Sequence, residues 1–235
     1  MNSIPFSVVF LAGGKGSRMG STIPKQYMKI RNKVLALYSF ELFLQMPQVQ
    51  ELVVVCEKEY QCFFEEFAYQ FHRNLRFAQP GQRRQDSVYN GISLLQENLL
   101  VCIHDGARPF IDTDLILRAV QAANIYDSSA VGIQVRSTIK VCNENQEVLQ
   151  TLNRNHLWEI QTPQVIRLEL LREGFTKANQ QQITVTDDVS LVELLGKKTK
   201  IVEGSCNNIK ITMPEDILIA EKIIDSLPNF EITSV

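Results

Sequence analysis

Short apolar stretches rich in β-branched residues recur along the chain, and longer segments with helical periodicity follow them. The apolar stretches span 7–12, 51–56, 99–104, 130–135 and 199–202. The helical segments are 34–45, 60–71, 87–96, 115–125, 168–177, 189–195 and 215–226. This alternation predicts an α/β fold in which a mostly parallel, twisted sheet carries helices on both faces. The near-continuous apolar character of the stretches is typical of strands that are buried on both sides.

The segment from Arg136 to Trp158 breaks this alternation. It is polar, lacks a strong helical period and has β-forming residues around the sequence Asn143-Glu144-Asn145-Gln146. A turn at these residues predicts a β-hairpin that projects from the body of the protein as an arm. Because we find no internal repeat or linker, we expect a single domain over residues 1–235, with the arm at 136–158.

Composition narrows the class of protein. The 235 residues are 45% hydrophobic and 21% charged, with a formal net charge of -2, which is typical of a globular protein. This balance argues against nucleic-acid binding by bulk charge, so an anionic ligand has to be held by a local cluster of positive residues. The sequence contains no apolar run of the ~18 residues that a membrane span needs and no secretory signal at its start. We therefore expect a soluble cytoplasmic protein.

The cysteines do not suggest a metal site or a disulfide framework. The chain has 5 cysteines, an odd number, and no CxxC pair. We expect three of them, which lie in or beside apolar runs, to be small core residues of a reduced protein. None of the 3 histidines is spaced with a cysteine as a pair of ligands, so we expect no zinc site.

The first apolar stretch runs into a glycine-rich loop, Gly13-Gly14-Lys15-Gly16-Ser17-Arg18-Met19, and Pro24-Lys25-Gln26 follows shortly afterwards. Glycines at the end of a strand let the backbone approach a ligand closely, and the amides of such a loop bind phosphate oxygens. Lys15, Arg18 and Lys25 add positive charge over a short distance. The loop therefore predicts a triphosphate site. A plain glycine-rich turn with solvated lysines is the simpler alternative, and the density of charge argues against it.

This loop departs from the two common nucleotide-binding fingerprints. Met19 stands where the dinucleotide fingerprint has its third glycine, and Glu57 lies too far along the chain to be the expected acidic residue. The Gly-Lys-Ser/Thr sequence of a P-loop is absent from this loop as well. A nicotinamide-dependent oxidoreductase is therefore disfavoured, whereas a non-catalytic nucleotide sensor stays open as an alternative.

A second charged motif, Gly81-Gln82-Arg83-Arg84-Gln85-Asp86-Ser87, stands just before a predicted helix. Asp86 or Ser87 can cap that helix, and free amides beside an arginine suit a nucleobase edge or a phosphate. Capping alone explains the motif equally well.

The sequence His104-Asp105-Gly106-Ala107-Arg108-Pro109 follows the most apolar of the predicted strands. Asp105 then falls at the carboxyl end of a strand, which is where open α/β sheets bind ligands. Its carboxylate can accept hydrogen bonds from substrate hydroxyls or hold a water molecule of a Mg²⁺ ion. The alternative is that Asp105 caps a turn and pairs with Arg108.

Weaker signals lie on the arm and in the last third of the chain. Thr138, Lys140 and Arg154 belong to the arm, Thr186-Asp187-Asp188 precedes a helix, and Lys210 stands beside the last strand. An N-cap explains Thr186 and a solvated charge explains Arg154 just as well. Lys210 is more informative, because an ammonium group buried between apolar neighbours needs an anionic partner.

Taken together, these motifs resemble the 2-C-methyl-D-erythritol 4-phosphate cytidylyltransferase family of the non-mevalonate isoprenoid pathway. The matching motifs cover almost the whole chain in order: Gly13-Gly14-x-Gly16-x-Arg18-Met19, Pro24-Lys25-Gln26, Arg84-x-Asp86-Ser87, His104-Asp105-Gly106-Ala107-Arg108-Pro109, Thr186-Asp187-Asp188 and Asn208-Ile209-Lys210-Ile211-Thr212. The resemblance implies a Rossmann-like nucleotidyltransferase fold, with CTP and a polyol phosphate as substrates. It further implies a Mg²⁺ requirement and a homodimer formed by exchange of arms.

The resemblance also implies roles for individual residues. Arg18 and Lys25 would stabilise the charge at the α-phosphate in the transition state. CTP would be bound by Gly13, Gly14, Gly16, Lys25, Gly81, Arg84 and Ser87. The acceptor would be held by Asp105, Thr138, Arg154, Thr186 and Lys210, of which Arg154 and Lys210 would direct its phosphate. No residue is implied as a direct metal ligand, and Asp105 would reach Mg²⁺ only through water.

Two segments depart from the usual pattern of this family. Gln82-Arg83 stand where acidic residues are common, which changes the charge of that loop. Asn153-Arg154 replace a common Asp-Arg pair, which bears on the orientation of Arg154. The nearest alternative in function is a cytidylyltransferase for another polyol phosphate such as ribitol 5-phosphate, because both acceptors present a phosphate and hydroxyls.

Overall fold

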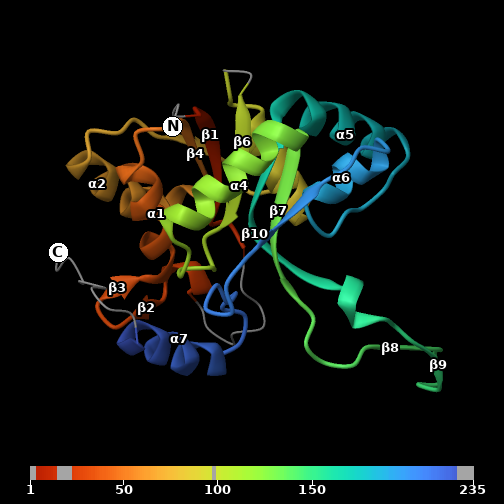
Figure 1. Cartoon of the computed structure of the whole chain (residues 1–235). Coiled ribbons are helices and arrows are strands. Elements are labelled where there is room, and N and C mark those ends of the chain that lie inside the picture. The colour runs from red at the N-terminus through yellow and green to blue at the C-terminus, as the bar shows by residue number, and fades with distance from the viewer. Residues whose placement is uncertain (1–3, 15–22, 97–98, 227–235) are drawn as a thin grey trace.

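The structure is a computed structural model that describes residues 4–14, 23–96 and 99–226. Seven strands of this part of the chain form one sheet in the order β11-β7-β10-β6-β1-β4-β5. Their bounds are β1 (Phe6–Leu11), β4 (Val49–Val55), β5 (Arg76–Ala78), β6 (Leu100–Asp105), β7 (Ser128–Gln134), β10 (Trp158–Arg167) and β11 (Lys200–Glu203). β10 is antiparallel to its neighbours β6 and β7, and the other pairs in the sheet are parallel. The predicted mostly parallel sheet is confirmed (Figure 1).

Helices cover both faces of the sheet. One face carries α1 (Leu35–Gln45), α2 (Gln61–Gln70) and α4 (Thr113–Tyr126), and the other carries α3 (Arg84–Ile92), α5 (Leu168–Gln180) and α6 (Val189–Leu194). Alternate residues of β1 divide between the two cores, since Phe10 packs into the first and Val9 into the second. This division follows from the alternation of side chains along a strand. The predicted layered α/β architecture is therefore confirmed.

Strand β10 was not predicted from the sequence. Gln161, Thr162 and Gln164 interrupt its apolar pattern, although all three are buried. Their polar groups are satisfied inside the protein: the Thr162 hydroxyl accepts from the amide of Asp105 at 3.1 Å, for example. A strand whose polar side chains bond within the fold lacks the apolar signature on which the prediction rests.

A third, smaller core lies beside the carboxyl ends of the strands. The hairpin of β2 (Lys29–Ile30) and β3 (Lys33–Val34) packs there against α7 (Glu215–Ser226). Ile211 belongs to this core, and its amide donates to the carbonyl of Ala107 at 2.9 Å. The segment 208–212 is thus a loop between β11 and α7 rather than part of a strand.

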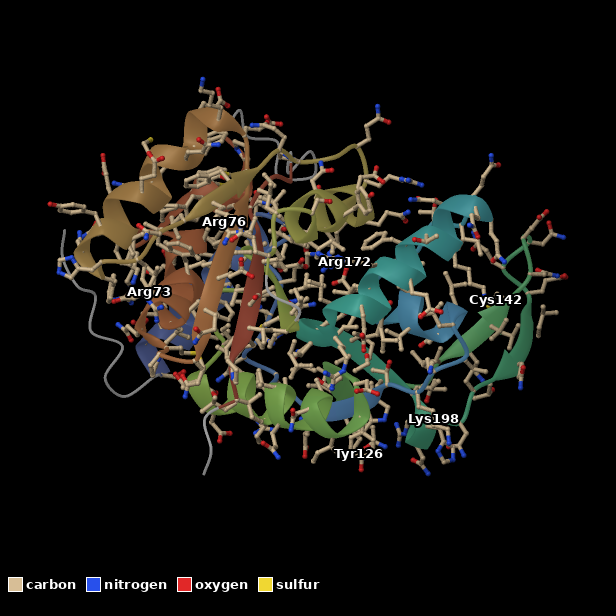
Figure 2. All side chains as sticks on the ribbon, turned by 90° about the horizontal axis from the view of Figure 1, so that it is seen from above. Arg73, Arg76, Tyr126, Cys142, Arg172 and Lys198 are labelled. Atoms are coloured by element: carbon tan, nitrogen blue, oxygen red, sulfur yellow. The ribbon has the colours of Figure 1, made fainter. Side chains whose placement is uncertain are left out.

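The predicted arm is confirmed as a hairpin. Its strands β8 (Lys140–Cys142) and β9 (Val148–Thr151) are antiparallel, and the Asn143 side chain holds the turn by accepting from the amide of Glu147 at 2.9 Å. The arm extends away from the layered body, and Cys142 lies at its outer part, on the side of the molecule opposite Arg73 (Figures 1 and 2). Val148 and Leu149 on β9 are 59% and 65% exposed.

Two of the five cysteines are core residues, one fewer than expected. Cys56 and Cys102 are buried, whereas Cys62, Cys142 and Cys206 are exposed. The expectation of a third buried cysteine was wrong, because the remaining cysteines lie on a helix surface, on the arm and in a loop, outside the apolar strands.

Across the three described ranges, no helix combines the length and the apolar character that crossing a membrane requires.

Candidate active site

A cavity of about 730 Å³ opens at the carboxyl ends of β1, β4, β5 and β6. Residues that end or follow these strands contribute to its lining, among them Gly13, Glu57, Pro80 and Asp105. This edge is the usual ligand site of an open α/β sheet. Most of the predicted site residues that the structure describes line the cavity: Gly13, Gly14, Lys25, Gly81, Arg84, Ser87, Asp105 and Lys210.

The remaining predicted residues either lie outside the described residues or are exposed elsewhere on the protein. Gly16 and Arg18 lie outside the described residues, as does Lys15. Thr138 and Arg154 are exposed on the arm, and Thr186 is exposed before α6. Arg154 donates through Nη1 to the carbonyl of Arg136 at 2.5 Å, so its side chain is held on the arm itself.

The glycine loop approaches its neighbours too closely for larger residues. A Cβ added to Gly13 would lie 2.2 Å from Cγ of Pro80, so a side chain there would displace the loop after β5. In the amide orientation that satisfies both contacts, the Gln26 side chain holds Gly14 on both sides: Nε2 donates to the Gly14 carbonyl at 3.0 Å, and Oε1 accepts from the Gly14 amide at 3.3 Å. These contacts bring the backbone of both glycines to the cavity in a fixed position.

Lys25 supplies a buried positive charge at the edge of the same cavity. It begins the short 3-10 helix η2 (Lys25–Tyr27) and is 8% exposed. Its Nζ donates to the carbonyl of Ile211 at 2.6 Å, which ties η2 to the loop that carries Lys210. The hydroxyl of Tyr27 donates to the carbonyl of Ala12 at 2.9 Å and ties η2 to the end of β1. The ammonium group is therefore held by the Ile211 carbonyl, and the helix η2 that carries it is tied to two other segments.

The loop before α3 is ordered by its own side chains. Ser87 Oγ accepts from the amide of Gly81 at 3.0 Å, and Asp86 Oδ2 accepts from the amide of Arg83 at 3.0 Å. The helix begins at Arg84 with Arg83 as its N-cap, so the expectation that Asp86 or Ser87 occupies the cap position was wrong. Asp86 instead reaches back from the third helical position, as the acidic residue of a capping box does. Its hydrogen bonds with Arg83 lower the pKa of Asp86.

Four charged side chains form a continuous chain of ion pairs beside the cavity. Lys210 Nζ lies 2.6 Å from Asp105 Oδ2, and Arg84 Nε lies 3.0 Å from Asp105 Oδ1. Arg84 also donates through Nη1 and Nη2 to the two carboxylate oxygens of Asp188, at 2.8 Å each. Lys210 has the anionic partner that we expected, although its side chain is 36% exposed rather than buried. The ion-pair partners of Asp105 are Arg84 and Lys210. Arg108 instead donates to the carbonyl of Asn208 at 2.7 Å.

These ion pairs fix the charges of Asp105 and Arg84 at neutral pH. Burial alone would raise the pKa of Asp105, but Arg84 and Lys210 outweigh it and hold that pKa well below its usual range. Burial alone would lower the pKa of Arg84, but Asp188 and Asp105 outweigh it and raise that pKa. Asp105 is therefore a permanent anion between two cations.

His104 supports Asp105 from inside the fold. The carbonyl of Arg108 can only accept, so Nε2 of His104 donates to it at 3.0 Å. Nδ1 of the neutral imidazole is then an acceptor, and the Thr162 hydroxyl, which itself accepts from the Asp105 amide, donates to it at 3.1 Å. Burial lowers the pKa of His104 to about 4. The imidazole is thus neutral at pH 7 and acts as a structural group.

The described residues do not form a metal site of their own. Within them, no group of three or more His, Cys, Asp or Glu side chains could hold a metal ion. Asp105, the carboxylate predicted to reach Mg²⁺ through water, already has a cation on each of its oxygens. The two cations beside Asp105 favour the binding of an anion at this place over the binding of a further cation.

Sequence reasoning missed the partner of Arg84. Asp188 appeared only as the last residue of the Thr186-Asp187-Asp188 motif, yet it is 1% exposed and binds the guanidinium on both oxygens. A carboxylate next to the buried, apolar start of α6 was the available signal, because a buried charge needs a partner.

Comparisons with known proteins agree with the resemblance found in the sequence. The model of the 2-C-methyl-D-erythritol 4-phosphate cytidylyltransferase family matches residues 6–226. The chloroplastic protein of that name from Oryza sativa subsp. japonica is 43% identical over 220 residues, which cover 93% of this chain and 74% of the relative. The protein of that name from Caldanaerobacter subterraneus is 40% identical over 219 residues, covering 92% of this chain and 96% of the relative.

Solved structures agree as well. The crystal structure of 4-diphosphocytidyl-2C-methyl-D-erythritol synthase from Anaerococcus prevotii matches with a TM-score of 0.86 at 25% identity, over 95% of this chain and 97% of the other. The 2-C-methyl-D-erythritol 4-phosphate cytidylyltransferase of Francisella tularensis matches with a TM-score of 0.77 at 29% identity, over 93% of this chain and 99% of the other. Sequence motifs, fold and overall similarity thus agree, and the chain belongs to the 2-C-methyl-D-erythritol 4-phosphate cytidylyltransferase family.

Proposed function

We propose that the protein transfers CMP from CTP to the phosphate of 2-C-methyl-D-erythritol 4-phosphate, giving 4-diphosphocytidyl-2-C-methyl-D-erythritol and pyrophosphate. One observation carries the proposal: in this member of the family, a single cavity is lined by the glycine loop and by the cations Lys25, Arg84 and Lys210. A protein with a net charge of -2 gains affinity for two anionic substrates only from such a local cluster.

The reaction is an in-line displacement at phosphorus. A phosphate oxygen of the acceptor bonds to the α-phosphorus of CTP as the bond to the pyrophosphate oxygen breaks. Because the attacking oxygen is already ionised at neutral pH, the step needs no general base. His104 is neutral and committed to Thr162 and Arg108, in keeping with this mechanism.

Charge that builds up at the α-phosphate has to be met by fixed cations. Lys25 is suited to this role because its ammonium is held by the Ile211 carbonyl before any substrate arrives. Such preorganised groups account for much of enzymatic rate enhancement. Arg18, which lies outside the described residues, is the second cation that we assign to this step.

The remaining CTP contacts are assigned to the two loops around the cavity. Gly13, Gly14 and Gly16 would offer backbone amides to the phosphates. Gly81, Arg84 and Ser87 would bind the base and ribose, with the Gly81 loop held in shape by Ser87. Gln82 and Arg83 also line the cavity, so the departure from the family pattern at these positions would face the nucleotide.

We infer that two chains build each acceptor site. Asp105 and Lys210 line the cavity and Thr186 precedes α6 of the same chain, whereas Thr138 and Arg154 are on the projecting arm. A short, isolated hairpin is marginally stable in water, and this one exposes Val148 and Leu149. Docking on a second copy would bury these residues and bring Thr138 and Arg154 to the partner's cavity, which makes the protein a homodimer with exchanged arms.

A Mg²⁺ requirement belongs to the same proposal. Because the described residues offer no metal site of their own, the ion would be held by the triphosphate and by water. We assign no protein ligand to it and expect activity to disappear when a chelator is in excess.

Pyrophosphate release from each of the four nucleoside triphosphates, with 2-C-methyl-D-erythritol 4-phosphate or ribitol 5-phosphate as acceptor, tests the proposal directly. CTP with the methylerythritol phosphate should give the highest kcat/KM. Faster turnover of UTP or of a purine triphosphate would contradict the nucleotide assignment, and faster turnover of ribitol 5-phosphate would contradict the acceptor assignment.

A further inference from the structure

Asp188 is the buried end of the chain of ion pairs beside the cavity. Its two oxygens accept from Nη1 and Nη2 of Arg84 at 2.8 Å each. A pair with this fork-to-fork geometry fixes the plane of the guanidinium as well as its position. The orientation of Arg84 is therefore set by a residue that is 1% exposed.

Asp188 is itself anchored to the central sheet. The amides of Asp188 and Val189 both donate to Oε1 of Gln164 on β10, at 2.8 Å and 3.1 Å. Gln164 is buried as well. The start of α6 is thus tied to a strand at the middle of the fold, and the position of the Asp188 carboxylate follows from this bond.

We propose that Asp188 is a positioning residue that fixes Arg84, and through Arg84 the carboxylate of Asp105, relative to the substrates. Arg84 and Asp105 line the cavity, whereas Asp188 is absent from the lining as described, so it acts on a ligand through Arg84. The inference rests on the proposed function for the identity of the two substrates.

The hydrogen bonds of Arg84 explain why the position of the Asp105 carboxylate depends on Asp188. Arg84 meets Asp105 through Nε alone, and Lys210 occupies the other oxygen of that carboxylate. Without Asp188, Arg84 would keep a single anionic partner and would turn its paired Nη groups toward Asp105. That movement would draw the carboxylate away from Lys210 and change the positions of both cavity cations.

When the Asp188 carboxylate is removed, the change in charge and the change in geometry predict opposite effects on CTP binding. The four groups Lys210, Asp105, Arg84 and Asp188 sum to zero charge, so removal of the Asp188 charge leaves a net positive charge beside the cavity. By charge alone, an anionic nucleotide would then bind more tightly. A loss of affinity for CTP therefore reports the loss of geometry.

The test compares Asp188→Asn with Asp187→Asn. Asp187 is the adjacent residue, and its Oδ1 accepts from the amide of Ser190 at 3.1 Å, so the control removes the same charge without touching Arg84. We expect Asp188→Asn to weaken the calorimetric Kd for CTP by ~10-fold and to lower kcat/KM by ~10- to 100-fold. Asp187→Asn should stay within about twofold of the wild type in both measurements.

A double-mutant cycle separates positioning from general damage to the fold. If Asp188 acts through Arg84, Asp188→Asn should change the Kd for CTP by less than about twofold in an Arg84→Met background. Arg84→Met leaves the buried Asp188 carboxylate without its partner, so adding Asp188→Asn should raise the unfolding temperature of that variant. This comparison remains available even if Asp188→Asn alone does not fold.

Three results would overturn the proposal: a Kd for CTP in Asp188→Asn equal to that of Asp187→Asn, an equal loss of affinity in both Arg84 backgrounds, or no gain in unfolding temperature in the double variant. CTP binding is measured without turnover. A wild type that binds CTP but releases no pyrophosphate would therefore refute the proposed function and leave the Asp188 comparison intact.

Discussion

Lys210 Nζ lies 2.6 Å from Asp105 Oδ2, so the cation that we assign to the acceptor phosphate is paired before any substrate is present. The pair joins the loop before α7 to the carboxyl end of β6. An incoming phosphate has to share the ammonium with Asp105, whose other oxygen is bound by Arg84. Asp105 thus holds Lys210 at the cavity and prevents it from turning to solvent.

Lys210→Met should raise the KM for the acceptor and lower kcat/KM by ~10- to 100-fold, because a charged hydrogen bond to the phosphate is lost while the alkyl volume is kept. The KM for CTP should change much less. Lys200→Met is the matched control, since Lys200 is exposed on β11 and faces Tyr126. Steady-state pyrophosphate release with each substrate varied in turn measures the effect. An unchanged acceptor KM would remove Lys210 from the acceptor site.

Lys25→Ala should lower kcat by ~100-fold or more, since its charge is assigned mainly to the transition state. The bond from Nζ to the Ile211 carbonyl is also lost, which should cost about 1–3 kcal/mol of stability, so the kinetics are measured well below the unfolding temperature. Lys29→Ala, which removes an exposed lysine of β2, provides the control. A variant with normal kcat and a raised KM for CTP would mean that Lys25 binds only the ground state.

The buried imidazole of His104 should make stability depend on pH between about 4 and 6.5. Its pKa is lowered in the folded state, so the unfolded chain binds more protons in this window. The free energy of unfolding should therefore rise with pH across it, by roughly 3 kcal/mol at about 1.4 kcal/mol per pKa unit. Urea unfolding at a series of pH values measures this slope.

His104→Gln should flatten that slope, whatever its own effect on stability. His72→Asn is the control, because His72 is exposed and has a positive φ of 52°, which asparagine tolerates. A slope that survives in His104→Gln would assign the pH dependence to other groups.

The layered fold followed from the sequence because its strands and helices carry strong periodic patterns. Helix α7 was predicted with its observed bounds, from Glu215 to Ser226, and the hairpin of the arm followed from its turn residues. Strand β10 escaped because Gln161 and Gln164 are buried with their polar groups satisfied inside the fold. Hydropathy cannot identify such a strand, since its burial depends on partners that are distant in sequence.

The contacts within the site could not be read from the sequence for a similar reason. Asp105 and Lys210 are 105 positions apart, and Arg84 and Asp188 are 104 apart. The motifs indicated that these residues matter, and the position of Asp105 at the end of a strand indicated where one of them lies. Which cation meets which carboxylate is decided by how the loops pack, as the pairing of Asp105 with Arg84 instead of Arg108 shows.

The assignment of Arg154 to the partner's site leads to a complementation experiment. Arg154 and Thr138 lie on the arm, whereas Lys210 lines the cavity, so Arg154→Ala and Lys210→Ala homodimers should each lose most of their activity when the acceptor is kept below its KM. In a heterodimer of the two variants, one site carries both substitutions and the other has both residues intact.

Mixing the variants under conditions that allow subunit exchange should therefore restore measurable activity, up to about one quarter of the wild-type value if exchange is random. Lys140→Ala, which changes an exposed lysine of the arm, is mixed with Lys210→Ala as a reference for a change on the arm outside the assigned site. Exchange is monitored independently by native mass spectrometry. If heterodimers form and no activity returns, each site is built within one chain and the arm has no role in binding the acceptor.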